Sequence, residues 1–525
     1  MSNTDTSVVL FYSDENGGID SVVKTLHSLA IQKSDLEIFI IDISNENVSV
    51  NTFKEAFNSN ESLNQIHIIK CDKDETFGTQ LNKAFESVTK THVLFLDNRS
   101  NQIIMKNGSV DLFKLATQRS KNCGLVYADY ELAQSDSVKE VKLLKHHIGR
   151  VRDNQDFGKV FFLSKAALNN VSYANGKLKF NTLYDLRLRL SEKYELLHLA
   201  NRYSGSLYSI IAEDKSQNVF DYLLASKESQ LEAEEVLGNH LKNISANLEA
   251  GNFYMPRPSA PQNATLKASV IIPTNNRPDF IATAIESVQA QTIKEVEVIV
   301  VVNGGDDDPT VQSVRKYLPG GEKYDPDKPG VQLLEYDINN LGLCLNMGAQ
   351  YAKGEYYVQL DSDDRLKPDA VEKILAVYKE DPNIGMVIGS YEVWEKQENG
   401  EITRMEDLPV VTHDEWTESN GRNNLLRING AGAPRSIPIE LIRQVGFSVN
   451  EEPYCRNYGE DYGMVLKLSE KHRIGRVWDA IYEVIRHSGG TDHSIDQETI
   501  DRNDEAKDYM RQEAISRRIK LNNEK

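Results

Sequence analysis

The chain has 525 residues, of which 40% are hydrophobic and 26% are charged, so it is long enough for several domains. Its 60 basic and 79 acidic residues give a net charge of -19, which excludes a general electrostatic attraction to a nucleic-acid backbone. No apolar run approaches the roughly 18 residues that cross a bilayer, and the N-terminus lacks the basic segment of a signal peptide. We therefore expect a cytoplasmic protein with no membrane-spanning segment and no nucleic-acid partner.

The first half of the chain opens with alternating strand and helix patterns. Apolar and β-branched runs predict strands at 7–12 and 36–42, with a helix at 19–30 between them. Near-continuous apolar strands of this kind are typical of parallel strands buried on both faces. Farther along, the stretch 220–248 has helical spacing and predicts one or two amphipathic helices, which either join the two halves or belong to the first core.

A glycine- and proline-rich segment at 251–261 marks a break in the chain. The same order of elements follows this break, with strands predicted at 268–273 and 296–302 and a helix at 280–290. Two further stretches of the second half resemble stretches of the first half in the same order and at nearly the same offset. We therefore predict that one fold is present twice.

The duplication and the break define four parts of the chain. We expect two α/β domains, a helical linker between them, and a charged C-terminal helix that is exposed and frays. Their boundaries are 1–215 for the first domain, 216–265 for the linker, 266–495 for the second domain and 496–525 for the tail.

Closely spaced carboxylates follow a predicted strand in the second domain. A strand that ends at Leu360 would deliver Asp361, Asp363 and Asp364 to its carboxyl end, where ligands bind in open α/β sheets. Alternating carboxylates at such a place can hold a hard divalent cation, and the cation can hold a diphosphate. Other D-x-D sequences of this acidic chain do not follow so clear a strand, so position singles out this one.

Two later motifs carry further titratable groups. Glu460 and Asp461 precede a short amphipathic helix, where they either stabilise its first turn or include a general base that accepts a proton from a hydroxyl. His487 ends a strand-like run and is followed by glycines. It is either an ordinary surface or core histidine or the residue that completes a carboxylate-bound metal site.

These motifs, taken in order, resemble glycosyltransferase family 2. The second domain carries SVIIPTNNRPDF, LDSDD, GEDYG and a closing IRH in the family's order. The resemblance implies an α/β chain of two tandem GT-A domains, which are Rossmann-like with mostly parallel sheets, joined by a helical linker. It also implies a metal-dependent inverting glycosyltransferase of hexosyltransferase type that moves a sugar from a nucleotide-diphospho-sugar to a glycan or glycoconjugate hydroxyl, in bacterial cell-surface polysaccharide synthesis.

The resemblance also implies roles for individual residues. Asp461 aligns with the catalytic base of the family and Glu460 with its neighbour. The residues that align with ligands of Mn²⁺ or Mg²⁺ are Asp361, Asp363 and His487. The residues that border the nucleotide-sugar donor are Pro273, Thr274, Asn275, Arg277, Asn303, Asn346, Asp361, Ser362 and Asp364.

One position departs from the family pattern. Val302 stands where the family often has an acid near the nucleobase, which leaves Asn303 or an acid of 306–308 as the residue that contacts the base. In the first half, Asp42 keeps the acid that Val302 lacks. The sequence therefore does not identify the nucleobase.

The first half keeps the scaffold but not the chemistry. Residues 97–100 align with the carboxylate motif, and Arg99 falls on a metal-ligand position, where its charge would repel a cation. Thr182 and Leu183 replace the acidic pair, and Ser209 falls where the histidine would be. We expect a catalytically silent first domain that binds the acceptor glycan, mediates dimerisation or supports the second domain. Formation of a homo-oligomer is therefore one of the alternatives.

Two readings from other classes compete with the enzyme. One is a non-catalytic glycan-binding or scaffold protein built from two decayed domains, against which the intact acidic residues and histidine of the second domain speak. The other is a nucleotidyl or phosphosugar transferase, which usually has a glycine-rich basic loop that is absent near the first strand of the second domain.

Overall fold

The computed structural model describes residues 6–14, 17–32, 34–45, 48–57, 65–134, 137–200, 205–211, 227–397, 399–412, 421–428, 430, 432–451, 453, 458–487 and 497–524. The chain divides into two compact units, Met1–Ile244 and Ser245–Lys525. The division falls inside the predicted linker 216–265, of which residues 216–226 lie outside the described part of the chain. Among the described helices, none combines the length and the apolar character that a membrane span requires.

The first unit alternates strands and helices in the order that the sequence predicts. Its elements are β1 (Thr6–Tyr12), α1 (Gly18–Ala30), β2 (Leu36–Asp42), α2 (Val50–Phe57), β3 (Ile66–Lys70), α3 (Phe77–Ser87), β4 (His92–Leu96), β5 (Gln102–Met105), α4 (Ser109–Thr117), β6 (Cys123–Ala128), β7 (Tyr130–Ala133), β8 (Val138–Val141), β9 (Val160–Ser164), α5 (Lys165–Asn170), α6 (Thr182–Ser191), β10 (Glu195–Leu199), β11 (Tyr208–Ile211) and α7 (Lys227–Asn243). Every residue of β1 and β2 is buried, as expected for parallel strands covered on both faces.

The second unit repeats this pattern. Its elements are β12 (Leu266–Thr274), α8 (Ile281–Gln289), β13 (Val296–Val302), α9 (Pro309–Arg315), β14 (Val331–Glu335), α10 (Leu341–Tyr351), β15 (Gly354–Gln359), β16 (Arg365–Leu366), α11 (Ala370–Glu380), β17 (Ile384–Lys396), β18 (Ile402–Arg404), α12 (Gly421–Asn424), β19 (Arg435–Pro438), α13 (Ile439–Val445), α14 (Glu460–Ser469), β20 (Arg473–Arg486) and α15 (Gln497–Asn523). The predicted strand at 296–302 has the observed bounds of β13, and the others shift by only a few residues.

The strand order of the two main sheets is the same. In the first unit it is β10-β6-β9-β4-β1-β2-β3, and in the second it is β20-β17-β19-β15-β12-β13-β14, with β16 paired beyond β20 and β18 paired with β17. In each sheet one inner strand runs antiparallel to both of its neighbours: β9 lies between β6 and β4, and β19 lies between β17 and β15. The predicted α/β class with two mostly parallel sheets is confirmed, and the shared order agrees with an internal duplication.

Side-chain contacts repeat along with the strand order. In the first unit the Ser7 hydroxyl donates to the Glu37 carboxylate at 2.7 Å, and in the second the Ser269 hydroxyl donates to Glu297 at 2.6 Å. Both pairs join the first two strands of their sheet. Equivalent buried polar pairs at equivalent places support a common origin of the two units.

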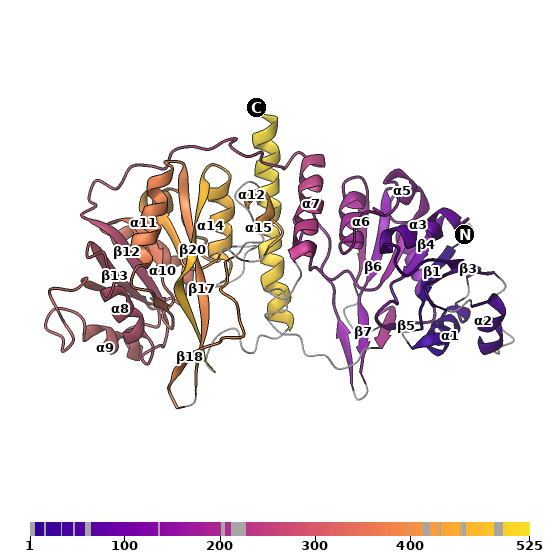
Figure 1. Cartoon of the computed structure of the whole chain (residues 1–525), viewed down its shortest axis with the longest axis horizontal. Helices are drawn as coiled ribbons and strands as arrows, with labels where there is room; N and C mark the ends of the chain where they lie inside the picture. The colour runs from indigo at the N-terminus through magenta and orange to yellow at the C-terminus, as the bar shows by residue number, and fades with distance from the viewer. Residues whose placement is uncertain are drawn as a thin grey trace. The chain divides into compact units, whose positions relative to one another are not determined.

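Helices flank the strands of both sheets (Figure 1). In the second unit, α8, α9 and α11 pack on one face, where alternate residues of β12 such as Val270 and Ile272 join their apolar core. The opposite face is covered by α10, α13 and α14. Gly348 of α10 lies directly on Ile271 of β12, where a Cβ would come within 2.6 Å of that side chain.

Helix α7 settles one alternative that the sequence left open. Its residues Ala233, Val236 and Leu237 are buried, and it packs on α6. His240 of α7 lies 3.0 Å from Glu192 at the end of α6. The helix therefore belongs to the core of the first unit.

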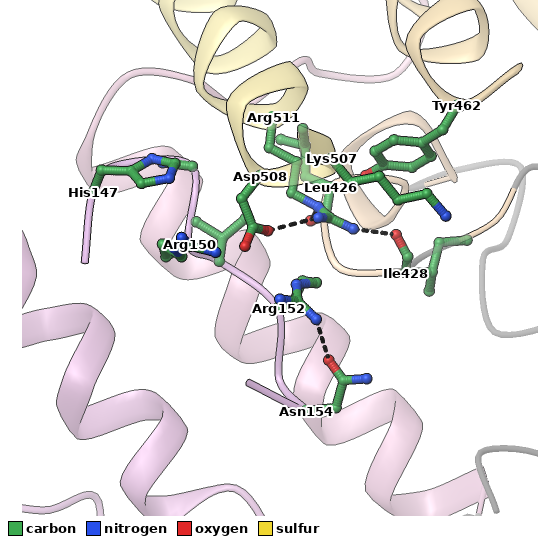
Figure 2. Close-up of polar contacts among 12 residues, drawn as sticks. His147, Arg150, Arg152, Asn154, Leu426, Ile428, Tyr462, Lys507, Asp508 and Arg511 are labelled. Carbon is green, nitrogen blue, oxygen red and sulfur yellow. Dashed lines mark hydrogen bonds and ion pairs between the residues drawn. The ribbon is translucent and has the colours of Figure 1, made fainter. Parts of the chain in front are cut away.

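The prediction of an exposed, fraying C-terminal helix is wrong. Arg511 of α15 is fully buried and donates to the carbonyls of Leu426 at 2.9 Å and Ile428 at 2.8 Å, while it pairs with Asp508 at 2.7 Å (Figure 2). Arg518, which lies farther along the same helix, donates to the Arg422 carbonyl at 2.6 Å. Paired charges and backbone acceptors take the place of large apolar residues at this contact, so hydropathy does not reveal it.

Candidate active site

Three parallel strands of the second unit end at one edge of the sheet. β12 pairs in parallel with β13 and β15, so the segments that follow Thr274, Val302 and Gln359 meet there. These segments carry most of the residues predicted to border a nucleotide-sugar. Parallel pairing thus gathers residues that are far apart in the sequence.

Asp363 and His487 come together beside Arg277. The antiparallel pairing of β16 with β20 brings the carboxylate motif to the end of β20, and Asp363 Oδ2 lies 3.1 Å from His487 Nε2 and 3.8 Å from Arg277 Nε. The imidazole also stacks on Phe280, with ring centroids 4.3 Å apart. The glycines after His487 lie outside the described residues.

Asp361 lies at the base of the same turn. Its backbone N–H donates to the Tyr482 hydroxyl at 3.1 Å, and the Gln359 amide donates to its carboxylate at 3.4 Å. Burial raises the pKa of Asp361, and the neighbouring charge of Asp363 raises it further, although Arg435 opposes both effects. This crowding of carboxylates favours the binding of a cation.

Asp364 has a different orientation. Its two carboxylate oxygens accept hydrogen bonds from the Tyr482 hydroxyl at 2.7 Å and from the Ile485 N–H at 2.8 Å. Burial raises its pKa well above the ordinary value. These contacts favour a role in fixing the carboxylate turn on β20 rather than the predicted contact with a donor; Ser362, beside it, is also buried.

The acidic pair begins helix α14. Gly459 precedes it in the left-handed conformation and is the N-cap residue, so no side chain at that position caps the helix. Asp461 Oδ2 lies 3.0 Å from Arg435 Nη1, and its other oxygen accepts from the Tyr462 N–H at 2.6 Å. Burial alone would raise the pKa of Asp461, but Arg435 and Lys507 lower it below the ordinary value.

Glu460 has the opposite shift. Burial, together with the adjacent charge of Asp461, raises its pKa to about 7. Its Oε2 atom is buried and has no hydrogen-bond partner among the described residues. The two carboxylates therefore have different protonation behaviour, with Asp461 ionised at neutral pH and available as a proton acceptor.

Arg435 is a site residue that sequence reasoning missed. It begins β19, donates through Nε to the Gln359 amide oxygen at 3.3 Å, and also donates to the Gly432 carbonyl. The charges of Asp461 and Asp361 both act on it. The only signal in the sequence is an arginine at the start of this short strand, Arg435–Pro438.

The sheet edge that is predicted to face the nucleotide carries a row of amides. Asn275 donates to Asn303 at 2.9 Å, and Asn303 donates to Asn339 at 3.4 Å. Thr274 Oγ1 is buried and has no hydrogen-bond partner among the described residues. Asn303 stays the candidate for nucleobase contact. Pro273, near the end of β12, is half-buried.

Asp308 has a structural explanation instead. Its carboxylate caps α9 by accepting from the Thr310 N–H at 2.8 Å and also accepts from the Asn276 N–H at 2.7 Å. Asn276 has a positive φ of 52°, so the carboxylate fixes a tight turn after β12. This use disfavours Asp308 as the residue that contacts a base.

Asn346 has a structural contact that the sequence did not predict. Its amide donates to the Phe447 carbonyl at 2.9 Å and accepts from the Phe447 N–H at 2.9 Å. In the first unit, Asn82 makes the same two bonds with Ala174, each 2.9 Å long. Both ends of the amide are used and the pair occurs in both units, so Asn346 holds α10 to the segment after α13. These contacts favour a structural role, and the contact with a nucleotide stays a prediction.

The corresponding edge of the first unit is occupied by its own side chains. Arg99 makes two hydrogen bonds to Asp97, of 2.7 and 3.1 Å, and its guanidinium lies 3.2 Å from the centre of the Phe77 ring. Asp42, which keeps the acid that Val302 lacks, pairs with Lys70 at 3.1 Å. Arg99 therefore lies where the second unit has a metal-ligand candidate.

Strand register corrects one alignment between the units. Tyr208 pairs with Met105, as Tyr482 pairs with Leu366, so Ser209 corresponds to Glu483 and not to His487. The counterpart of His487 falls at residue 213, outside the described residues. Thr182 and Leu183 do begin α6, as the acidic pair begins α14.

The residues that could hold a metal form an incomplete set. Within the described ranges, no three acidic, histidine or cysteine side chains converge as a complete metal site. Asp363 and His487 are adjacent, and Asp361 is on the same turn. Carboxylate and imidazole suit Mn²⁺, and Mg²⁺ is commonly held by one or two carboxylates with substrate phosphates, so this set fits a cation that binds together with a diphosphate.

Comparison with known proteins identifies the domain. Residues 269–430 match the model of Glycosyl transferase family 2, a range that includes Asp361 and Asp363 and ends before the acidic pair and His487. Chondroitin synthase of Escherichia coli is 27% identical over 257 residues, or 48% of this chain and 34% of that protein. Hyaluronan synthase of Pasteurella multocida is 31% identical over 224 residues, or 42% of this chain and 21% of that protein.

The matched segment therefore spans only 34% of the first of these relatives and 21% of the second. Among solved structures, Staphylococcus aureus TarS 1–349 in complex with UDP-GlcNAc is 21% identical with a TM-score of 0.34, over 44% of this chain and 62% of that one. The mannosyltransferase PcManGT of Pyrobaculum calidifontis, in complex with GDP-Man and Mn2+, is 18% identical with a TM-score of 0.32, over 50% and 67%. The chain contains a glycosyl transferase family 2 domain at residues 269–430.

Proposed function

We propose that this chain is a metal-dependent inverting glycosyltransferase, which transfers a sugar from a nucleotide-diphospho-sugar to a hydroxyl of a glycan or glycoconjugate. We further propose that it acts in bacterial polysaccharide synthesis. The names of the matched relatives, a chondroitin synthase and a hyaluronan synthase, support a glycan acceptor. The first unit, with Arg99 paired to Asp97, takes no part in the chemistry.

One observation carries the proposal. Arg435 pairs with Asp461 at 3.0 Å and is also acted on by the charge of Asp361, so a single guanidinium links the proposed base to the donor side of the site. In an inverting glycosyl transfer, the attacking hydroxyl, with the base that takes its proton, and the leaving group lie on opposite sides of the anomeric carbon. Arg435 supplies that connection within the second unit.

The residues of the chain then have distinct tasks. Asp461, ionised beside Arg435, accepts the proton of the acceptor hydroxyl as its oxygen attacks the anomeric carbon. Asp363 and His487, with Asp361, would hold Mg²⁺ or Mn²⁺, which when bound offsets the charge of the departing nucleoside diphosphate. Because the hydroxyl attacks opposite the leaving group, the anomeric configuration inverts.

The test follows release of nucleoside diphosphate from UDP-, GDP- and dTDP-sugars with Mn²⁺ or Mg²⁺. We expect Asp461→Asn and Asp363→Ala to lower turnover by about a hundredfold or more. Asp185→Asn is the matched control, since Asp185 lies near the start of the equivalent helix α6 and pairs with Arg189 at 2.6 Å. Unchanged turnover by Asp461→Asn would show that the base is another residue.

The competing function is a non-catalytic glycan-binding protein. It predicts glycan binding by the wild type without release of nucleoside diphosphate from any donor. Equilibrium binding of the same nucleotide sugars, with and without the metal, separates the two cases, because only the proposed enzyme requires metal-dependent donor binding by the second unit.

A further inference from the structure

The C-terminal helix α15 lies against the segment that carries the proposed base. The Met510 side chain packs so close to Gly459 that a Cβ there would lie 3.2 Å from its methyl carbon. Arg511, one residue on, binds the carbonyls of Leu426 and Ile428 and has its guanidinium 4.8 Å from the centre of the Tyr462 ring (Figure 2). This part of α15 is therefore fixed against the start of α14.

Lys507, one turn before Arg511, contacts the same segment. Its ammonium lies 3.3 Å from the Tyr458 hydroxyl and 4.5 Å from the centre of the Tyr458 ring. It is also 5.6 Å from the centre of the Tyr462 ring, beside which Figure 2 draws it. Two aromatic rings, one on each side of Glu460 and Asp461 in the sequence, thus contact the ammonium of Lys507.

The charges around Lys507 come from both helices. Burial lowers the pKa of Lys507 to about 8, while Asp461 and Glu460 of α14 and Asp504 of its own helix oppose this effect, and Arg511 adds to it. In return, Lys507 lowers the pKa of Asp461, second to Arg435 among the charges that do so. The charge of Asp461 is therefore acted on by two cations, Arg435 of β19 and Lys507 of α15.

We propose that Lys507, held beside the start of α14 by Tyr458 and Tyr462, is a positioning residue for catalysis: a second cation that, with Arg435, sets the electrostatic environment of Asp461. The inference rests on the proposed function. It gives the charged C-terminal helix a role in the reaction that neither the family-matched range nor the sequence motifs include. Lys507 acts through Asp461 and makes no contact with the donor in this proposal.

The experiment compares full-length wild type with Lys507→Met and Lys507→Arg, using release of nucleoside diphosphate from the donor that the wild type prefers. We expect Lys507→Met to lower kcat about tenfold or more with the donor KM unchanged, because the lysine affects the base and not donor binding. Lys507→Arg keeps the charge and is expected to recover most of the rate. Lys520→Met is the matched control, since Lys520 is on the same helix and its side chain is 76% exposed.

The pH dependence gives an independent readout. In the wild type, Lys507 loses its charge as the pH rises through about 8, so kcat is expected to fall there, and Lys507→Met should lack this step. Tyr458→Phe, which removes only the hydroxyl near the ammonium, is a milder variant and is expected to lower kcat about two- to threefold. It keeps the test valid if Lys507→Met does not fold, which thermal unfolding shows.

The outcomes separate the two proposals. If the wild type is active and both Lys507→Met and Tyr458→Phe match Lys520→Met in kcat and in pH profile, the assignment of Lys507 is wrong while the enzyme stands. If Lys507→Met raises only the donor KM, the lysine belongs to donor binding and the positioning role is also wrong. If the wild type releases no nucleoside diphosphate from any donor, the proposed function fails and the assignment fails with it.

Discussion

Arg435 Nη1 lies 3.0 Å from Asp461 Oδ2, and the negative charge of Asp361 also acts on this arginine. The arginine comes from β19, the strand that runs antiparallel between β15 and β17. It is the main charge that keeps the pKa of Asp461 low against the effect of burial. The first unit has no equivalent cation there, since strand register places Phe161 at that position.

Replacement of Arg435 by methionine is therefore expected to lower turnover and to change its pH dependence. Loss of the cation raises the pKa of Asp461, so the base is protonated up to a higher pH, and the acidic limb of the kcat profile moves up by about one pH unit. Arg435→Lys should lie between the two. Arg473→Met, which removes a surface pair with Asp381, is the control, and an acidic limb that stays in place would contradict the assignment.

Replacement of Glu460 by glutamine is expected to stabilise the protein at alkaline pH. The pKa of Glu460 is about 7 in the folded chain against an ordinary value of 4.5, so the folded state binds the proton more tightly. Stability from this group is then present below pH 4.5 and is lost as the pH rises to about 7. Removing the charge should recover about 1–3 kcal/mol at pH 8, or roughly 2–6 °C in Tm.

Thermal unfolding at pH 5 and pH 8 checks this expectation. The Tm of Glu460→Gln should exceed that of the wild type clearly at pH 8 and only slightly at pH 5, where the wild-type carboxyl is already protonated. Glu406→Gln is the matched control, because that side chain is 74% exposed. An equal gain at both pH values would mean that packing, and not the buried charge, explains the result.

The fold was largely predictable from the sequence because its signals are local. Apolar runs such as 296–302 define buried strands, and two copies of one pattern predict one fold twice. The role of α15 was not predictable in this way. Besides apolar side chains such as Met510, its buried contacts include the charged residues Arg511, Asp508 and Arg518. Charged residues that pair inside a protein have the same hydropathy as charged residues in solvent.

The site was predictable where a motif carries it and not where long-range pairing creates it. Asp363 and His487 are adjacent as the motifs suggest. Arg435 and Lys507 reach Asp461 through strand order and through a distant helix, which no local pattern records. For Asp364, the sequence gives the position on the turn but not the direction of the side chain, which here points to the backbone of β20.

Replacement of Asn346 by alanine separates its structural role from the predicted donor contact. The change removes both hydrogen bonds to the Phe447 backbone, and each buried group left without a partner costs about 1–3 kcal/mol. We expect a lower Tm with an unchanged donor KM. Asn82→Ala breaks the equivalent bonds to Ala174 and should destabilise the first unit by a similar amount. If Asn346→Ala instead raises the donor KM and leaves the Tm unchanged, Asn346 contacts the nucleotide of the donor.

Replacement of Arg99 by alanine tests whether the first unit is silent. Burial raises the pKa of Asp97, but the hydrogen bonds and charge of Arg99 and the charge of Lys159 lower it below the ordinary value, so the pair stabilises the folded unit above the ordinary pKa of the acid and less as the pH falls. Arg99→Ala should therefore cost stability at neutral pH, by about 1 kcal/mol after allowance for the partly exposed arginine. Release of nucleoside diphosphate should stay at the wild-type rate, whereas Asp363→Ala abolishes it. If Arg99→Ala instead stops turnover while the protein remains folded, the first unit takes part in the reaction, and its Arg99 replaces a metal ion rather than excluding one.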